Sequence, residues 1–201
     1  MKVDRYGRSI LVPSLSVAVL LLTPLTVMAH AVNKRFGDFY GGMFHPLTSV
    51  VHLFPLIGLG LLAGLQGPSK ARWALPTLLV GLLVGGLVGW YFGKLIWISM
   101  VNKASLILVG ILVVTAARIP AWGISLLALL VALSHGHENG SDASGSATLQ
   151  LFLAGVLTSG LLLVAVPAAV VVSLQAAWQR IAVRVLGSWV AATGLLILSV
   201  P

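Results

Sequence analysis

The sequence contains no cysteine. This absence excludes disulfide bonds, thiolate metal sites and cysteine nucleophiles. Any metal site in this chain must therefore use histidine, carboxylate and backbone oxygen ligands.

Charged residues are also scarce, at 8% of 201 positions, whereas hydrophobic residues make up 59%. A soluble domain carries about 25% charged residues, so this chain has too little charge to cover a water-facing surface. A bilayer-spanning helix needs about 20 apolar residues. The composition predicts an all-α fold, a polytopic transmembrane helical bundle, with the lipid bilayer as its main partner.

Acidic residues are the rarest charged class: four Asp and Glu stand against twelve Lys and Arg, for a net charge of +8. The bases lie singly or in pairs at the ends of apolar runs, which is how membrane proteins fix their orientation. No basic stripe is present for phosphates to follow, so we expect no nucleic-acid partner. With the mature N-terminus outside, the loops hold five bases on the cytoplasmic side (Lys70, Arg72, Arg118, Arg180, Arg184) and four outside (Lys34, Arg35, Lys94, Lys103).

Residues 1–31 are predicted to be a secretory signal. Three bases occur in the first eight positions, an apolar stretch follows from Ile10 to Met28, and Ala29-His30-Ala31 fits an A-x-A cleavage site. The alternative is an uncleaved signal anchor. Residues 32–201 are expected to form a single transmembrane helical domain.

Six further apolar runs predict six mature spans. The second contains four closely spaced glycines, which predicts close helix packing. The runs cover Phe44–Leu65, Trp73–Phe92, Ala104–Ala117, Ala121–Ser134, Leu149–Leu174 and Ile181–Val200, and the glycines are Gly81, Gly85, Gly86 and Gly89.

The five histidines form three clusters, and the predicted orientation places all of them in the outer half. His45 and His52 are seven residues apart on one predicted helix, or ~10.5 Å along its axis. We therefore expect them to act as successive stations for one ion rather than to hold it jointly. His135 and His137 open a predicted loop, Ser134–Ala147, where they could converge on one ion with Glu138. With His30, these residues are the candidate ligands of a divalent transition metal. The alternative is structural: His45 capping a helix start and His52 bonding a neighbouring carbonyl.

The stretch Phe44-His45-Pro46-Leu47-Thr48-Ser49-Val50-Val51-His52-Leu53 resembles the HPxxGxDH signature of the HupE/UreJ family. These are small membrane proteins associated with hydrogenase and urease clusters and assigned to nickel uptake. The family pattern also has a cleaved signal ending near Ala-His, an Ala-Leu-Pro that opens the second span (Ala74-Leu75-Pro76 here), and a His-Gly-His loop after the fourth. The resemblance covers essentially the whole chain and implies six mature spans.

Two positions depart from the signature: Ser49 stands where the family has Gly, and Val51 stands where it has Asp. The second change removes the carboxylate expected beside His52. A divalent cation there would lack charge compensation within the membrane.

The sequence thus favours uptake or acquisition of a transition-metal cation across the bacterial inner membrane. The metal is a substrate, with nickel favoured over cobalt, zinc or copper, and no organic cofactor is expected. The alternative is a divergent, non-transporting subunit with a membrane-complex partner or a homo-oligomeric state. We expect no enzyme activity, because a metal-dependent hydrolase would need a positioned base and only Glu138 lies near the histidines.

Overall fold

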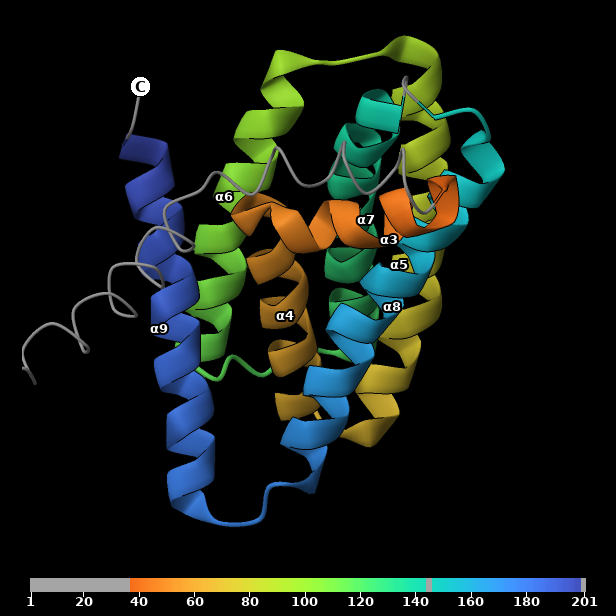
Figure 1. Ribbon diagram of the computed structural model, residues 1–201. Coiled ribbons are helices and arrows are strands. Elements are labelled where there is room, and N and C mark those ends of the chain that lie inside the picture. The colour runs from red at the N-terminus through yellow and green to blue at the C-terminus, as the bar shows by residue number, and fades with distance from the viewer. Residues whose placement is uncertain (1–36, 144–145, 200–201) are drawn as a thin grey trace, which may run out of the picture.

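The computed structural model describes residues 37–143 and 146–199, which form seven α-helices and no strand (Figure 1). This confirms the all-helical prediction. The predicted signal, 1–31, lies outside the described residues, and so does His30. The helices are α3 (Asp38–Thr48), α4 (Val50–Leu65), α5 (Pro68–Phe92), α6 (Ile96–Val114), α7 (Ala121–Asp142), α8 (Leu149–Ser173) and α9 (Ala177–Ser199).

Four of these helices, α5, α6, α8 and α9, are long and apolar enough to cross a membrane. The pair α3 and α4 meets the same test jointly but is bent by 80° at its break. Helix α7 has 22 residues and falls short because its last part, from Ser134 to Asp142, is polar. The described residues therefore contain four candidate spans, or five if the bent pair is one span, and the predicted count of six is not confirmed.

Two predicted boundaries were wrong at the same end of the bundle. Helix α6 begins at Ile96 rather than Ala104, and α7 continues to Asp142 rather than ending at Ser134. The extension of α7 is a polar stretch that resembles a loop in the sequence, whereas the extension of α6 is largely apolar and ends at Asn102 and Lys103. The two extensions meet inside the bundle, where Asn102 donates to the Ser134 carbonyl and to Glu138.

Helices α5 and α7 lie side by side along most of their length (Figure 1). A Cβ added at Gly89 of α5 would lie 1.9 Å from the backbone oxygen of His137 in α7, so only glycine permits this approach. The close packing predicted from the glycines of α5 is confirmed. The largest cluster of buried residues lies where these two helices meet α4 and α8, and it includes Leu56, Leu59, Leu62, Leu78, Leu82, Ala128, Ala132 and Val164.

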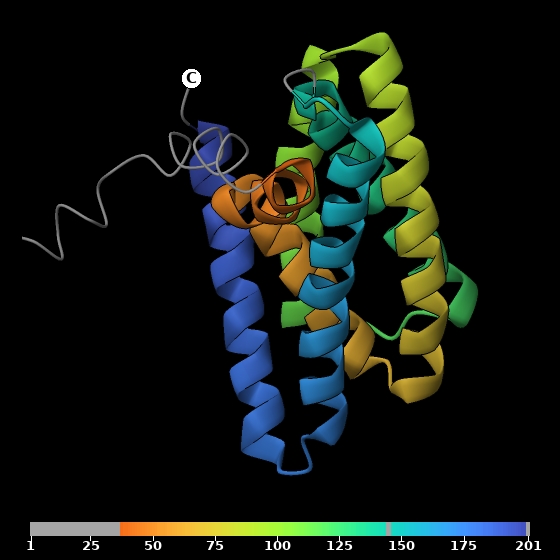
Figure 2. The same ribbon diagram turned by 45° about the vertical axis from the view of Figure 1, so that its right-hand side comes forward.

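Helix α3 lies across the long helices instead of along them, and Figure 2 views it nearly end-on. It packs on α8 through backbone contact. A Cβ at Gly42 would lie 1.9 Å from the Phe152 oxygen, and one at Gly155 would lie 2.0 Å from the Phe39 oxygen. These contacts fix the position of α3 along the length of α8.

Charge is divided between the two ends of the bundle. Among the described residues, five bases lie at the end holding the α4–α5, α6–α7 and α8–α9 connections, and no acid lies there. Lys94, Lys103, Glu138 and Asp142 lie toward the opposite end, near the α5–α6 and α7–α8 connections.

Candidate metal site

The site begins at the break between α3 and α4. Ser49 separates the two helices with φ −113° and ψ 118°, an extended conformation that any residue adopts. Thr48 Oγ1 donates to the His45 carbonyl at 3.0 Å and closes the last turn of α3. The family's glycine position is thus where the chain breaks, and serine is tolerated because no positive φ is required.

The break changes the relation between His45 and His52. Their ring centroids are 6.1 Å apart, whereas an unbroken helix would separate the residues by ~10.5 Å along its axis. The sequence prediction of one continuous helix was therefore wrong at this point. Two imidazoles on one ion have ring centres roughly 5 to 6 Å apart, given metal–nitrogen bonds of about 2.1 Å. The pair is close to that separation.

A third histidine continues the series inward. His52 Nδ1 lies 2.8 Å from His135 Nδ1 of α7. The side chain of His45 is 21% exposed, whereas His52 and His135 are 4% and 0% exposed. The three rings therefore run from the surface of the bundle into its interior.

Hydrogen-bond logic assigns the protons along this series. Ser105 Oγ donates to the Asn102 carbonyl at 2.7 Å, so it accepts from His135 Nε2, which lies 2.9 Å away. A neutral His135 then has a bare Nδ1 and accepts from His52 Nδ1–H. A neutral His52 therefore carries its lone pair on Nε2, the nitrogen through which it can bind a metal. A metal-binding histidine usually donates its other N–H to such a partner.

An acidic residue stands beside the outermost histidine. Asp142, the last residue of α7, places Oδ2 3.6 Å from His45 Nε2 and Oδ1 3.9 Å from Lys94 Nζ. On its other side His45 meets Phe152 of α8 in an edge contact, with centroids 5.9 Å apart. Helices α3, α7 and α8 thus all contribute to the position of this imidazole, and Lys94, two residues after the end of α5, pairs with Asp142.

The structure does not bring His137 and Glu138 into the series. Because α7 is helical here, residues two apart point about 200° apart around the axis, so the predicted convergence of His135 and His137 is wrong. His137 is buried, and its Nε2 has no hydrogen-bond partner. Glu138 accepts from Asn102 Nδ2. Within residues 37–143 and 146–199, no three His, Asp or Glu side chains are grouped to hold one ion.

Three polar residues that the sequence analysis passed over support the site. Asn102 donates to the Ser134 carbonyl at 3.3 Å, Ser105 accepts from His135, and Asn139 donates to the His135 carbonyl at 2.6 Å. Both asparagines are fully buried. The available signal was polar residues beside or inside apolar runs, which in a membrane protein usually face the bundle interior.

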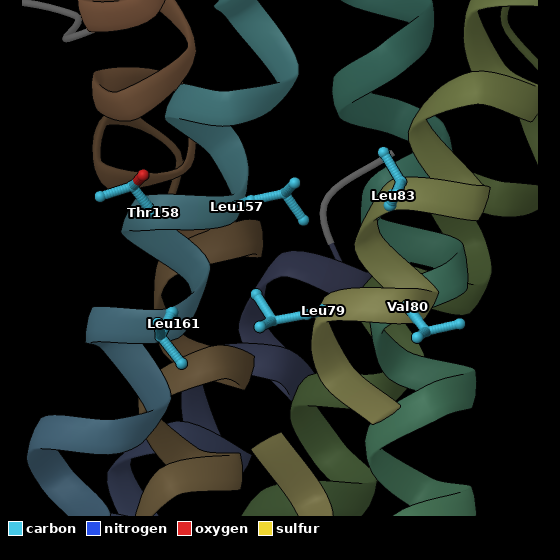
Figure 3. Close-up of a pocket in the computed structure, with 6 residues that line it drawn as sticks. All are labelled: Leu79, Val80, Leu83, Leu157, Thr158 and Leu161. Atoms are coloured by element: carbon cyan, nitrogen blue, oxygen red, sulfur yellow. The ribbon is translucent and has the colours of Figure 1, made fainter. Parts of the chain in front are cut away.

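A groove of about 310 Å³ lies elsewhere, between α5 and α8 (Figure 3). It is lined by Leu79, Val80, Leu83, Leu157, Thr158 and Leu161. None of these residues is ionisable, so the groove offers a cation no ligand set comparable to the histidine series.

Two comparisons with known proteins match this chain. The sequence model of the family described as HupE / UreJ protein matches residues 17–197. Protein HupE of Rhizobium leguminosarum bv. viciae is 28% identical over 143 residues, which cover 69% of this chain and 73% of that protein. No solved structure matches.

Proposed function

The chain belongs to the HupE/UreJ family, and from that membership and the histidine series we propose that it takes up a transition-metal cation, with nickel favoured. Members of this family are tied to hydrogenase and urease accessory roles and nickel handling, and they are accessory or transport proteins rather than catalysts. The observation that carries the proposal is the run of His45, His52 and His135 from the surface of the bundle to its core.

In this proposal His45 and His52 bind the ion and His135 positions His52. Both nitrogens of His135 are engaged, by His52 and by Ser105, so it has no free lone pair to offer. Imidazole nitrogen suits nickel, cobalt, zinc and copper alike. The ligand type alone therefore does not select nickel, and the preference for nickel rests on the family.

The division of charge between the two ends of the bundle supports an orientation in which the His45 end faces outward. Lys and Arg favour the cytoplasmic side of a membrane protein, so the end with five bases faces the cytoplasm. The His45 end then faces outward, where it can capture a cation. The proposal includes a bacterial inner-membrane location, in which case the His45 end faces the periplasm.

The alternative is a non-transporting subunit of a membrane complex. Two observations favour it: Val51 stands where the signature has Asp, and the described residues contain no group of three metal-binding side chains. In this case the histidine series would be a buried hydrogen-bond network that stabilises the bundle.

The test is metal binding by the full-length chain purified in detergent. Nickel, cobalt, zinc and copper are titrated against the wild type and against a His45→Ala/His52→Ala variant. His137→Ala is the matched control, because it removes a buried imidazole outside the series. Thermal unfolding of each variant checks that the bundle is retained.

We expect saturable binding in the wild type and in His137→Ala, and loss of binding in the double variant. Uptake of the bound metal into proteoliposomes then tests transport itself. Absence of saturable binding by the wild type would overturn the proposal and favour the structural subunit.

A further inference from the structure

We propose that Asp142 supplies a carboxylate in place of the signature aspartate, whose position is Val51 here. We propose further that Lys94 forms an ion pair with Asp142 until a metal cation displaces the lysine. The inference rests on the proposed function and adds a carboxylate from the end of α7 beside His45, the outermost histidine of the series. It comes from a residue 91 positions beyond Val51 in the sequence, which only the fold brings beside His45.

The distance between His45 and Asp142 supports a shared ion. Their nearest atoms, Nε2 and Oδ2, are 3.6 Å apart, which is longer than a hydrogen bond. Two ligand atoms that bind one ion with bonds of about 2.1 Å lie roughly 3.0 Å apart at 90° and 3.4 Å apart at the tetrahedral angle. A separation of 3.6 Å corresponds to about 120°, so the pair accommodates one ion with little movement.

Charge compensation supports the same assignment. A divalent cation held only by neutral imidazoles keeps both its charges, which is costly near the membrane interior. The signature aspartate would offset one of them from the helix that carries His52. Here Val51 cannot, whereas Asp142 lies beside His45, the outermost histidine, and is 36% exposed to solvent.

Lys94 neutralises the charge of the Asp142 carboxylate when no metal is bound. Its Nζ lies 3.9 Å from Asp142 Oδ1, the oxygen that does not face His45. The Lys94 side chain is 66% exposed and follows Gly93, the φ +71° residue that ends α5. It can therefore swing into water without disturbing a packed helix. A cation that binds between His45 and Asp142 is repelled by this ammonium group, so Lys94 sets the affinity of the outer site.

The experiment measures Ni²⁺ affinity of the full-length chain in detergent for Asp142→Asn, Lys94→Met and the double variant. Lys103→Met is the matched control, because Lys103 is another base toward the same end and makes no ion pair within the described residues. Asp142→Glu keeps the carboxylate and guards against a purely structural effect. Thermal unfolding confirms that each variant is folded.

We expect Asp142→Asn to weaken Ni²⁺ binding at least tenfold, and Asp142→Glu to retain most of the wild-type affinity. Lys94→Met should tighten binding about three- to tenfold at low salt, because it removes a positive charge near the ion. That gain should vanish in the Asp142→Asn background and be absent in Lys103→Met. A loss of stability alone cannot produce tighter binding.

The outcomes separate this inference from the proposed function. If His45 and His52 are needed for binding but Asp142→Asn and Lys94→Met leave the affinity unchanged, the inference is overturned and the proposed function stands. If the wild type binds no metal, both are overturned.

Discussion

Gly42→Ala should weaken metal binding without changing any of the proposed ligands. The new Cβ would lie 1.9 Å from the Phe152 oxygen, and real Cβ atoms essentially never approach within 3.0 Å. Helices α3 and α8 must therefore separate by at least about 1 Å here, because close-packed backbone offers no slack. His45 lies one turn along α3 and moves with it. Overpacking of this kind costs about 1–3 kcal/mol of stability.

We expect Ni²⁺ affinity to fall about tenfold or more, as when the support of a metal ligand is disturbed. Titration of the detergent-purified variant measures the affinity, and thermal unfolding measures the stability. Gly155→Ala, on the other side of the same contact, should give the same result. Gly160→Ala is the control on α8, because its Cβ meets only the end of the Leu82 side chain. Wild-type affinity in Gly42→Ala and Gly155→Ala would refute the claim that this crossing positions His45.

Two further substitutions test the supports of the bundle. Ser105→Ala leaves His135 Nε2 without its acceptor, so we expect a loss of about 1–3 kcal/mol in unfolding free energy and weaker Ni²⁺ binding, read by thermal unfolding and titration; an unchanged affinity would show that His135 does not position His52. Gln66→Leu removes two hydrogen bonds, of 2.7 and 2.9 Å, that tie the end of α4 to the α6–α7 loop, and it should lower the unfolding temperature while Ni²⁺ affinity stays the same.

The sequence was a good guide to the bundle, because its main signal is long apolar runs. The runs at Leu149–Leu174 and Ile181–Val200 correspond to α8 and α9 within a few residues. The glycines of the second run predicted close packing, and their contacts with α7 confirm it. These features depend on composition and local spacing, which the chain displays directly.

The sequence misled where polar residues interrupt the apolar runs. The stretch from Ser134 to Asp142 resembles a loop by composition, yet it is helical and mostly buried against α5 and α6. Its polar groups are stabilised by partners such as Asn102 and His135, which lie far away in sequence or on the same helix. Such partners follow from tertiary packing and cannot be deduced from local pattern.

The candidate site was predicted in part. His45, His52 and His135 were identified, and the structure brings them into one series, whereas it separates His137 and Glu138 from them. The break at Ser49 was not foreseen, because neither neighbouring residue is a strong helix breaker and the apolar pattern continues across it. Because the break was not predicted, the proximity of Asp142 to His45 could not be predicted either.

The break at Ser49 also joins two helix ends of opposite polarity. The C-terminal end of α3 carries a partial negative charge and the N-terminal end of α4 a partial positive charge, each about half an elementary charge. His45 lies in the last turn of α3 and His52 in the first turn of α4, so an ion held by both lies between these two ends. The backbone of α3 attracts this cation and the backbone of α4 repels it. The angle between α3 and α4 therefore affects the affinity of the pair for a cation as well as the distance between its two imidazoles.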